Sequence, residues 1–101
     1  MKVNIESVHF RTGKKLVLFI NERIEKLVEH HQKILNIDVV LELGNKPDNK
    51  IVEIKLNYEG RLLYAKKQSD TFEKSVDLAV EALRRQLRKK KTITRRKKRF
   101  K

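Results

Sequence analysis

The chain of 101 residues is long enough for one domain with a modest hydrophobic core. It contains no cysteine, which excludes a disulfide framework, a thiolate zinc site and a cysteine nucleophile, and no segment resembles a signal peptide or a membrane span. We therefore expect a cytoplasmic protein, and the formal net charge of +13 predicts nucleic acid as its first partner, ahead of an anionic membrane surface.

Alternating apolar and polar residues predict a strand at the N-terminus, and a helix follows it. Val3 and Ile5 alternate with polar residues, and the Thr-Gly pair at 12–13 marks a break and a helix cap. From Lys14 onward the apolar residues recur every three or four positions, which predicts an amphipathic helix. The residues expected on its buried face are Leu16, Ile20, Ile24, Leu27 and His31.

Three strands are predicted in succession in the middle of the chain. Apolar residues alternate with polar residues over 37–43 and 52–58, and a third alternation centres on 63–65. Turn-forming residues separate these strands, namely the stretch at 44–49 with the only proline and the Glu-Gly pair at 59–60. The three strands should form an antiparallel meander, and the first strand can join the sheet through the crossover helix.

The C-terminal third of the chain is predicted to begin as an amphipathic helix capped by Asp70 or Thr71. Its apolar face consists of Phe72, Val76, Ala79, Val80, Leu83 and Leu87. At Lys90 a charge falls within this face, which indicates that the helix has outrun the core and ends soon afterwards. We therefore divide the chain into an α+β domain at 1–91 and a flexible basic tail at 92–101.

The end of the chain concentrates the positive charge. Residues 84–101 contain 12 Lys and Arg but no Asp or Glu. Like charges along a helix repel one another unless a polyanion neutralises them. This pattern predicts contact with phosphate groups, although a disordered tail that only keeps the protein soluble remains an alternative.

We expect an α+β fold with the order β-α-β-β-β-α and a basic C-terminal arm. A four-stranded sheet should carry both helices on one face, as in double-stranded-RNA-binding domains, because each predicted helix has a single apolar stripe. The opposite face of the sheet should be open to water. The polar residues expected on that face are Asn4, Glu6, Glu42, Glu53, Lys55 and Asn57.

No arrangement of residues predicts an enzyme, a metal site or a cofactor. His30 and His31 are adjacent, so on a helix they would face different directions, whereas a pair of metal ligands needs a spacing of three or four. Gly13 and the two lysines after it lack the other residues of a phosphate-binding loop. Tyr64 and Phe100 are candidates for stacking on bases, although Tyr64 also fits an ordinary strand position. We expect neither catalysis nor a small-molecule substrate.

A motif in the C-terminal helix resembles a known family. A Val-Asp pair at 76–77 precedes the pattern Leu-x-Arg-Gln-Leu-x-Lys-x-Lys at 83–91. Both resemble short-form ribosome hibernation-promoting factors, a family also called ribosome-associated inhibitor or sigma-54 modulation protein. A weaker match lies at 23–27, and the resemblance covers residues 1–91. One departure is Thr-Phe-Glu at 71–73, where the family often has Asp-Met/Leu-Tyr.

The resemblance implies binding to the rRNA of the small ribosomal subunit, in the channel used by mRNA and tRNA. Residues 1–91 would be the ribosome-binding domain, which would block initiation by occlusion in stationary phase or starvation. The cations expected to contact RNA are Arg23, Lys26, Arg84, Arg85, Arg88, Lys89, Lys91, Arg95 and Arg96. The printed chain ends before the dimerisation domain of long-form members, so we expect ribosome dimerisation to need a second factor.

Two other binding functions remain open from the sequence. A constitutive structural protein of the ribosome would also be small and basic, but it would stay on ribosomes in every growth phase. A double-stranded-RNA-binding module would share the arrangement of two helices on one face of a sheet. It would bind free duplex RNA as well as it binds ribosomes.

Overall fold

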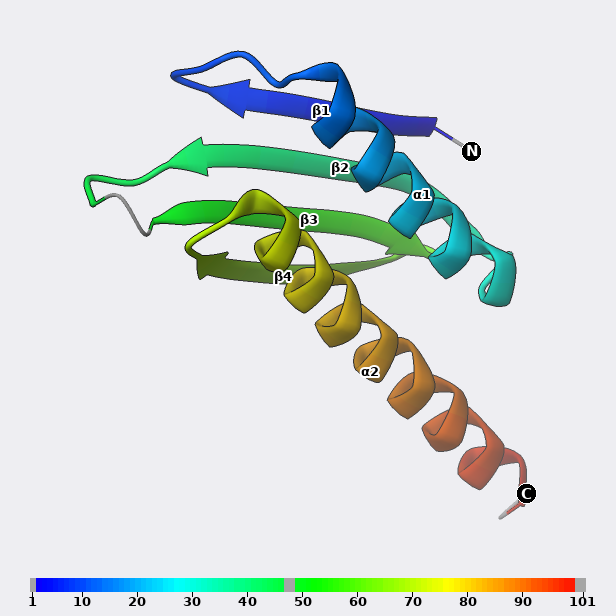
Figure 1. Ribbon diagram of the computed structural model, residues 1–101. Helices are drawn as coiled ribbons and strands as arrows, with labels where there is room; N and C mark the ends of the chain where they lie inside the picture. Colours follow the sequence, from blue (N-terminus) through cyan, green and yellow to red (C-terminus); the bar gives the residue numbers. More distant parts are fainter. Residues whose placement is uncertain (1, 47–48, 100–101) are drawn as a thin grey trace.

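The computed structural model describes the backbone of residues 2–46 and 49–99, and the side chains within these ranges up to Arg88 (Figure 1). Its elements in chain order are β1 (Lys2–Val8), α1 (Lys14–His30), β2 (Ile34–Leu43), β3 (Lys50–Tyr58), β4 (Arg61–Ser69) and α2 (Phe72–Arg99). The predicted order is confirmed, and with it the α+β class.

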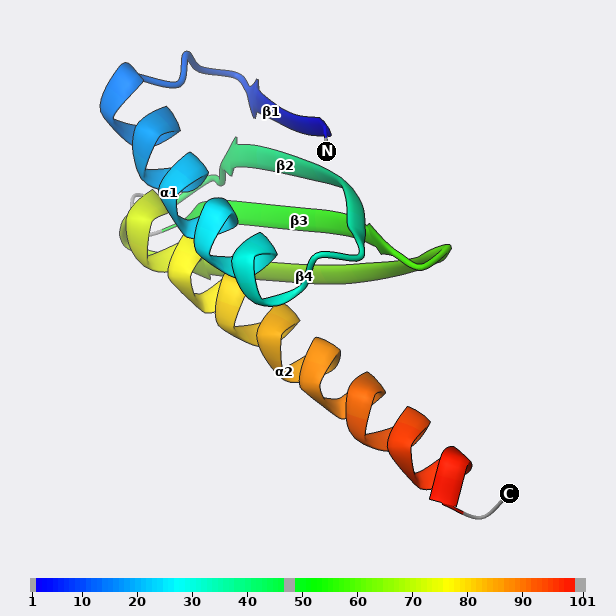
Figure 2. The same ribbon diagram turned by 90° about the vertical axis from the view of Figure 1, so that its right-hand side faces the viewer.

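The strands of the described residues form one four-stranded sheet with the spatial order β1-β2-β3-β4. β2, β3 and β4 pair in antiparallel fashion, as successive strands joined by short connections do, whereas β1 and β2 are parallel. A parallel pair needs a crossover connection, and α1 provides it. Both helices lie on the same face of the sheet, with α1 toward β1 and β2 and α2 over β3 and β4 (Figure 1 and Figure 2).

The hydrophobic core lies between the sheet and the two helices. Because side chains of a strand point to opposite faces in turn, alternate residues of β2, β3 and β4 are buried. Among these strand residues are Ile37, Val39, Leu41, Val52, Ile54, Leu56, Leu63 and Ala65. The helices contribute Ile20, Ile24, Leu27, Val76, Ala79, Val80, Leu83 and Leu87. The predicted core residues Leu16 and Phe72 are partly buried against this cluster, and His31 is buried beside the end of α1.

Removing a core side chain should destabilise the fold, whereas removing an exposed one on the same helix should not. Leu83 is fully buried, and Leu78 is 47% exposed. Leu83→Ala is expected to lower the free energy of unfolding by about 3 kcal/mol, because it leaves a cavity. The matched control, Leu78→Ala, should change it by less than about 0.5 kcal/mol. Urea denaturation followed by circular dichroism measures both variants, and equal effects would contradict the position of Leu83 in the core.

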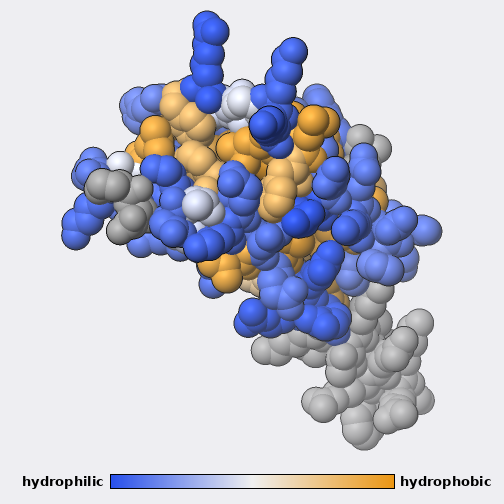
Figure 3. Space-filling model, viewed as in Figure 1, coloured by the Kyte–Doolittle hydropathy of each residue, from blue (hydrophilic) through white to orange (hydrophobic). Residues whose placement is uncertain are grey.

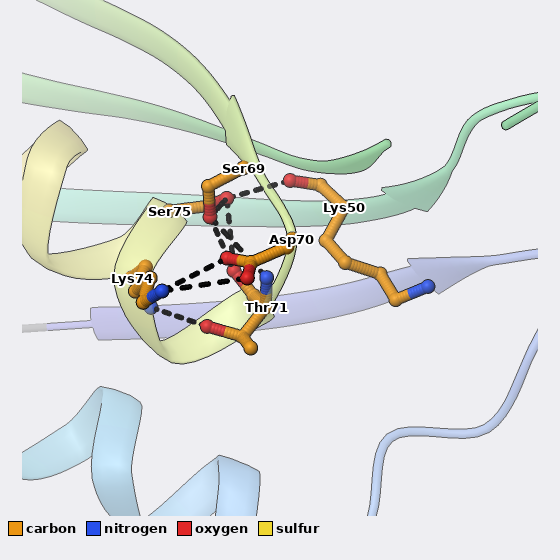
Figure 4. A network of polar contacts seen from close by, with 6 residues as sticks. All are labelled: Lys50, Ser69, Asp70, Thr71, Lys74 and Ser75. Atoms are coloured by element: carbon orange, nitrogen blue, oxygen red, sulfur yellow. Dashed lines mark hydrogen bonds and ion pairs between the residues drawn. The ribbon is translucent and has the colours of Figure 1, made fainter. Parts of the chain in front are cut away.

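A network of hydrogen bonds fixes the beginning of α2 against the sheet (Figure 4). Thr71, one of the two predicted caps, accepts a hydrogen bond at Oγ1 from the backbone N–H of Lys74 at 3.1 Å. The buried hydroxyl of Ser75 donates to the backbone carbonyl of Lys50 in β3 at 2.6 Å. Ser75 Oγ also lies 2.9 Å from Ser69 Oγ at the end of β4. Contacts with two strands therefore set the direction in which α2 leaves the sheet.

Helix α2 is longer than the sequence predicted. It continues to Arg99, so the expected end soon after Lys90 is wrong. Residues 88–99 contain neither Gly nor Pro, and Lys and Arg are good helix formers, so the helix can persist after its apolar face has ended. The charge within the apolar face therefore does not mark the end of the helix. The functional division at 1–91 and 92–101 stays a prediction, and the last two residues lie outside the described ranges.

The sheet face opposite the helices carries the predicted polar residues. Asn4, Glu6 and Lys55 are exposed, while Glu42, Glu53 and Asn57 are partly buried. The strand register aligns Glu6, Val40, Glu53 and Lys66 in one row across the sheet. Acidic and basic side chains therefore mix on this face, in contrast to the run of cations at the end of α2.

Candidate nucleic-acid interface

Helices α1 and α2 run side by side in the same direction over the sheet (Figure 1 and Figure 2). A groove lies between them. The groove has a volume of about 290 Å³ and is lined by Arg23, Lys26, Asp77, Val80, Glu81 and Arg84. Hydrophilic side chains predominate on this side of the molecule, with smaller apolar areas among them (Figure 3). Since three cations and two carboxylates line the groove, it carries a net positive charge and suits an anionic group.

Arg23 of α1 is held in place from two sides. Its Nε donates a hydrogen bond to Oδ1 of Asp77 on α2 at 2.7 Å, a short charge-assisted contact between the two helices. Its guanidinium also lies over the ring of Phe19, 4.2 Å from the ring centroid, as in a cation–π contact. The side chain is only 29% exposed. Asp77 uses Nε, and Oε2 of Glu22 lies 4.0 Å from Nη1, too far for a hydrogen bond. The terminal amino groups of the guanidinium can therefore donate to a further acceptor.

Lys26 and Arg84 face the same groove from opposite helices. Lys26 is exposed on α1, and Arg84 is partly buried on α2. Among the described residues, neither has an ion-pair partner within 4.0 Å. Both cations are therefore available to an incoming phosphate, Arg84 as a bidentate donor and Lys26 as a point charge.

Glu81 faces two further arginines of α2. Its Oε1 lies 3.9 Å from Nε of Arg85 and 3.4 Å from Nη2 of Arg88. The arginine side chains are 70% and 65% exposed. Such exposed, long contacts contribute little to folding stability, so these guanidinium groups can change partners at low cost.

The profile of the family described as sigma 54 modulation protein / S30EA ribosomal protein matches residues 3–95. The chain belongs to this family. The resemblance seen in the C-terminal helix is thereby confirmed, and the family is non-enzymatic, as the sequence predicted.

Solved structures of similar proteins share this fold. A ribosomal subunit interface protein from Coxiella burnetii is 23% identical, with a TM-score of 0.84 over 91% of this chain and 99% of that one. The N-terminal domain of Protein Y from Thermus thermophilus is 18% identical, with a TM-score of 0.77 over 88% of this chain and 98% of that one. At these identities the likeness supports the fold. A sequence comparison with proteins of curated function found no significant match.

The fold brings together part of the predicted set of RNA-binding cations. Arg23, Lys26 and Arg84 line the groove, and Arg85 and Arg88 are exposed next to Glu81. The remaining members of the set belong to α2, but their side chains lie outside the described residues; they are Lys89, Lys91, Arg95 and Arg96. RNA binding by any of these cations stays a prediction.

The structure separates Tyr64 from these cations. Its neighbours in β4, Leu63 and Ala65, point into the core, so Tyr64 points to the sheet face opposite the helices, where it is 43% exposed. Desolvation and then a hydrogen bond with Glu53 raise the pKa of its phenol. A base stacked on Tyr64 would lie on the other side of the sheet from the groove. The second stacking candidate, Phe100, lies outside the described residues.

The sequence reasoning missed the two acidic residues of this site. In the sequence, Asp77 stood out only as part of the family motif. Its partner Arg23 is 54 positions away, and only the packing of the helices brings the two side chains together. Glu81 could have been found, since it precedes Arg85 by four positions, the spacing at which opposite charges meet on a helix.

Two kinds of site are absent from the part of the chain that the structure describes. No group of three or more His, Cys, Asp or Glu side chains could hold a metal ion there. No helix in these ranges is long and apolar enough to cross a membrane.

Proposed function

We propose that this protein binds the rRNA of the small ribosomal subunit, occupies the channel used by mRNA and tRNA, and blocks initiation by occlusion. It would act in the cytoplasm as a hibernation factor, in stationary phase or starvation. The observation that carries the proposal is the cationic groove between α1 and α2, in a chain that matches a family of ribosomal proteins over residues 3–95.

The geometry supports contact with an RNA backbone rather than with bases. The sheet and its core hold both helices rigidly, so the groove cations keep fixed positions. Helix α2 has 28 residues and therefore spans about 40 Å, which carries its basic end beyond the sheet (Figure 1). Lysine and arginine recognise phosphates without reading sequence, which suits a partner of fixed shape. Inhibition then requires occupancy of the channel and no chemical step.

Co-sedimentation with purified small subunits tests the proposal. We expect binding that weakens steeply with salt, by about three orders of magnitude between 50 and 200 mM if roughly six phosphates are contacted. mRNA and initiator tRNA together should displace the protein, because they use the same channel. Binding that ignores both would favour a structural ribosomal protein, and a preference for free duplex RNA would favour a double-stranded-RNA-binding module. Either result would contradict the proposed function.

A further inference from the structure

We propose that Glu81 is a specificity-determining residue that competes with RNA phosphates for Arg85 and Arg88. It thereby lowers the affinity of this surface for RNA in general more than its affinity for the small subunit. The inference deepens the proposed function and rests on it for the identity of the specific partner.

Glu81 is placed to act on several cations at once. One carboxylate oxygen lies within 4.0 Å of both Arg85 and Arg88, and the residue also lines the groove next to Lys26 and Arg84. It is the last acidic residue in the sequence, so every later charged side chain is positive. Its carboxylate therefore stands at the boundary between the groove and the basic end of α2.

The two carboxylates of the groove differ in how they bind arginine. Asp77 makes a contact of 2.7 Å with Arg23, a side chain that is 29% exposed and stacked on Phe19. Glu81 makes contacts of 3.4 and 3.9 Å with arginines that are mostly exposed. The first pair joins the helices and positions Arg23, whereas the second is loose enough for a phosphate to displace the carboxylate.

When an RNA phosphate displaces the Glu81 carboxylate from Arg85 and Arg88, the loss of binding free energy depends on the kind of RNA. A phosphate that approaches Arg85 and Arg88 is repelled by the carboxylate, and only a well-aligned pairing of arginine and phosphate offsets this repulsion. Flexible single-stranded RNA forms few such pairs at once, so the repulsion weakens its binding. A folded RNA that presents phosphates at fixed positions forms many contacts together. The repulsion at one contact is then a smaller share of its total binding free energy.

The test compares Glu81→Gln with Glu6→Gln, which removes the same charge on the opposite face of the sheet. We expect Glu81→Gln to bind a short oligouridine strand about two- to fivefold more tightly than Glu6→Gln does at the same salt. The corresponding increase in affinity for small subunits should be smaller. Arg85→Gln with Arg88→Gln in the same chain should remove this difference, since the guanidinium groups are then absent. Thermal denaturation checks that the variants remain folded, as expected for a side chain that is 46% exposed.

The outcomes separate this inference from the proposed function. Equal affinities of Glu81→Gln and Glu6→Gln for oligouridine would overturn the role of Glu81 while leaving subunit binding untouched. A difference that persists without Arg85 and Arg88 would also overturn it, because the gain in affinity would then come from other cations near Glu81, such as Lys26 and Arg84 of the groove. Failure of the wild-type protein to bind small subunits would overturn the proposed function, and with it the specificity assigned to Glu81.

Discussion

Replacing both Arg85 and Arg88 by glutamate is expected to weaken binding to the small ribosomal subunit by about a hundredfold or more, because each charge-assisted contact contributes about 1.5–3 kcal/mol. The two side chains are 70% and 65% exposed, so the core does not depend on them. New repulsion from Glu81 should lower the helix stability by only about 0.5 kcal/mol. Co-sedimentation at fixed salt measures the loss, and circular dichroism measures whether the fold is retained.

The matched control reverses two charges on the other face of the sheet. Lys2→Glu with Lys55→Glu changes the net charge by the same amount, and both lysines are exposed. This control should bind the small subunit within a few-fold of the wild-type protein, since neither residue lies on the helical face. An equal loss in the two double variants would show that net charge alone governs binding, and would remove the reason for assigning the contact to α2.

The parts of the fold that the sequence predicted are those that local patterns determine. The buried positions of β2, β3 and α2 follow from periods of two and of three to four, because a side chain's direction depends on its own backbone. Phe10 shows the limit of this reasoning. Val8 and Phe10 continue the alternation of Val3 and Ile5 loosely, past an irregularity, but the strand ends at Val8 and the backbone turns at His9 with φ 70°. Phe10 then stacks on Phe72 at the start of α2, with the ring centroids 5.0 Å apart.

The cations of the candidate site were predictable from the sequence, and Glu81 could have been found from its spacing to Arg85, but the role of Asp77 could not. A run of lysine and arginine is visible in the sequence, and its attraction to phosphate follows from charge. The pairing of Arg23 with Asp77 depends on two helices packed in parallel on one sheet face, which no local pattern encodes. The end of α2 was missed for a related reason: the prediction equated the end of the apolar face with the end of the helix. Backbone hydrogen bonds and propensity sustain a helix without a core beneath it.

Removing residues 92–101 is expected to reduce both the affinity for the small subunit and its dependence on salt. The segment contains six cations, namely Arg95, Arg96, Lys97, Lys98, Arg99 and Lys101. If all of them neutralise phosphates, the slope of log affinity against log salt should become shallower by about four to five, and the affinity at moderate salt should fall by about a hundredfold or more. The core should survive, because Leu87 is its last buried member among the residues whose side chains the structure describes. A salt series by co-sedimentation measures both quantities.

The slope of log affinity against log salt distinguishes the two interpretations of residues 92–101. A tail that only keeps the protein soluble predicts a truncated protein with an unchanged slope, because no counterions are released at its cations. A chain with residues 92–101 in scrambled order is the matched control. If the arm follows phosphates by charge alone, scrambling should preserve the slope, since the number of cations is the same. If scrambling flattens the slope as much as truncation does, the positions of the cations along α2 matter, and the arm binds as an ordered continuation of the helix.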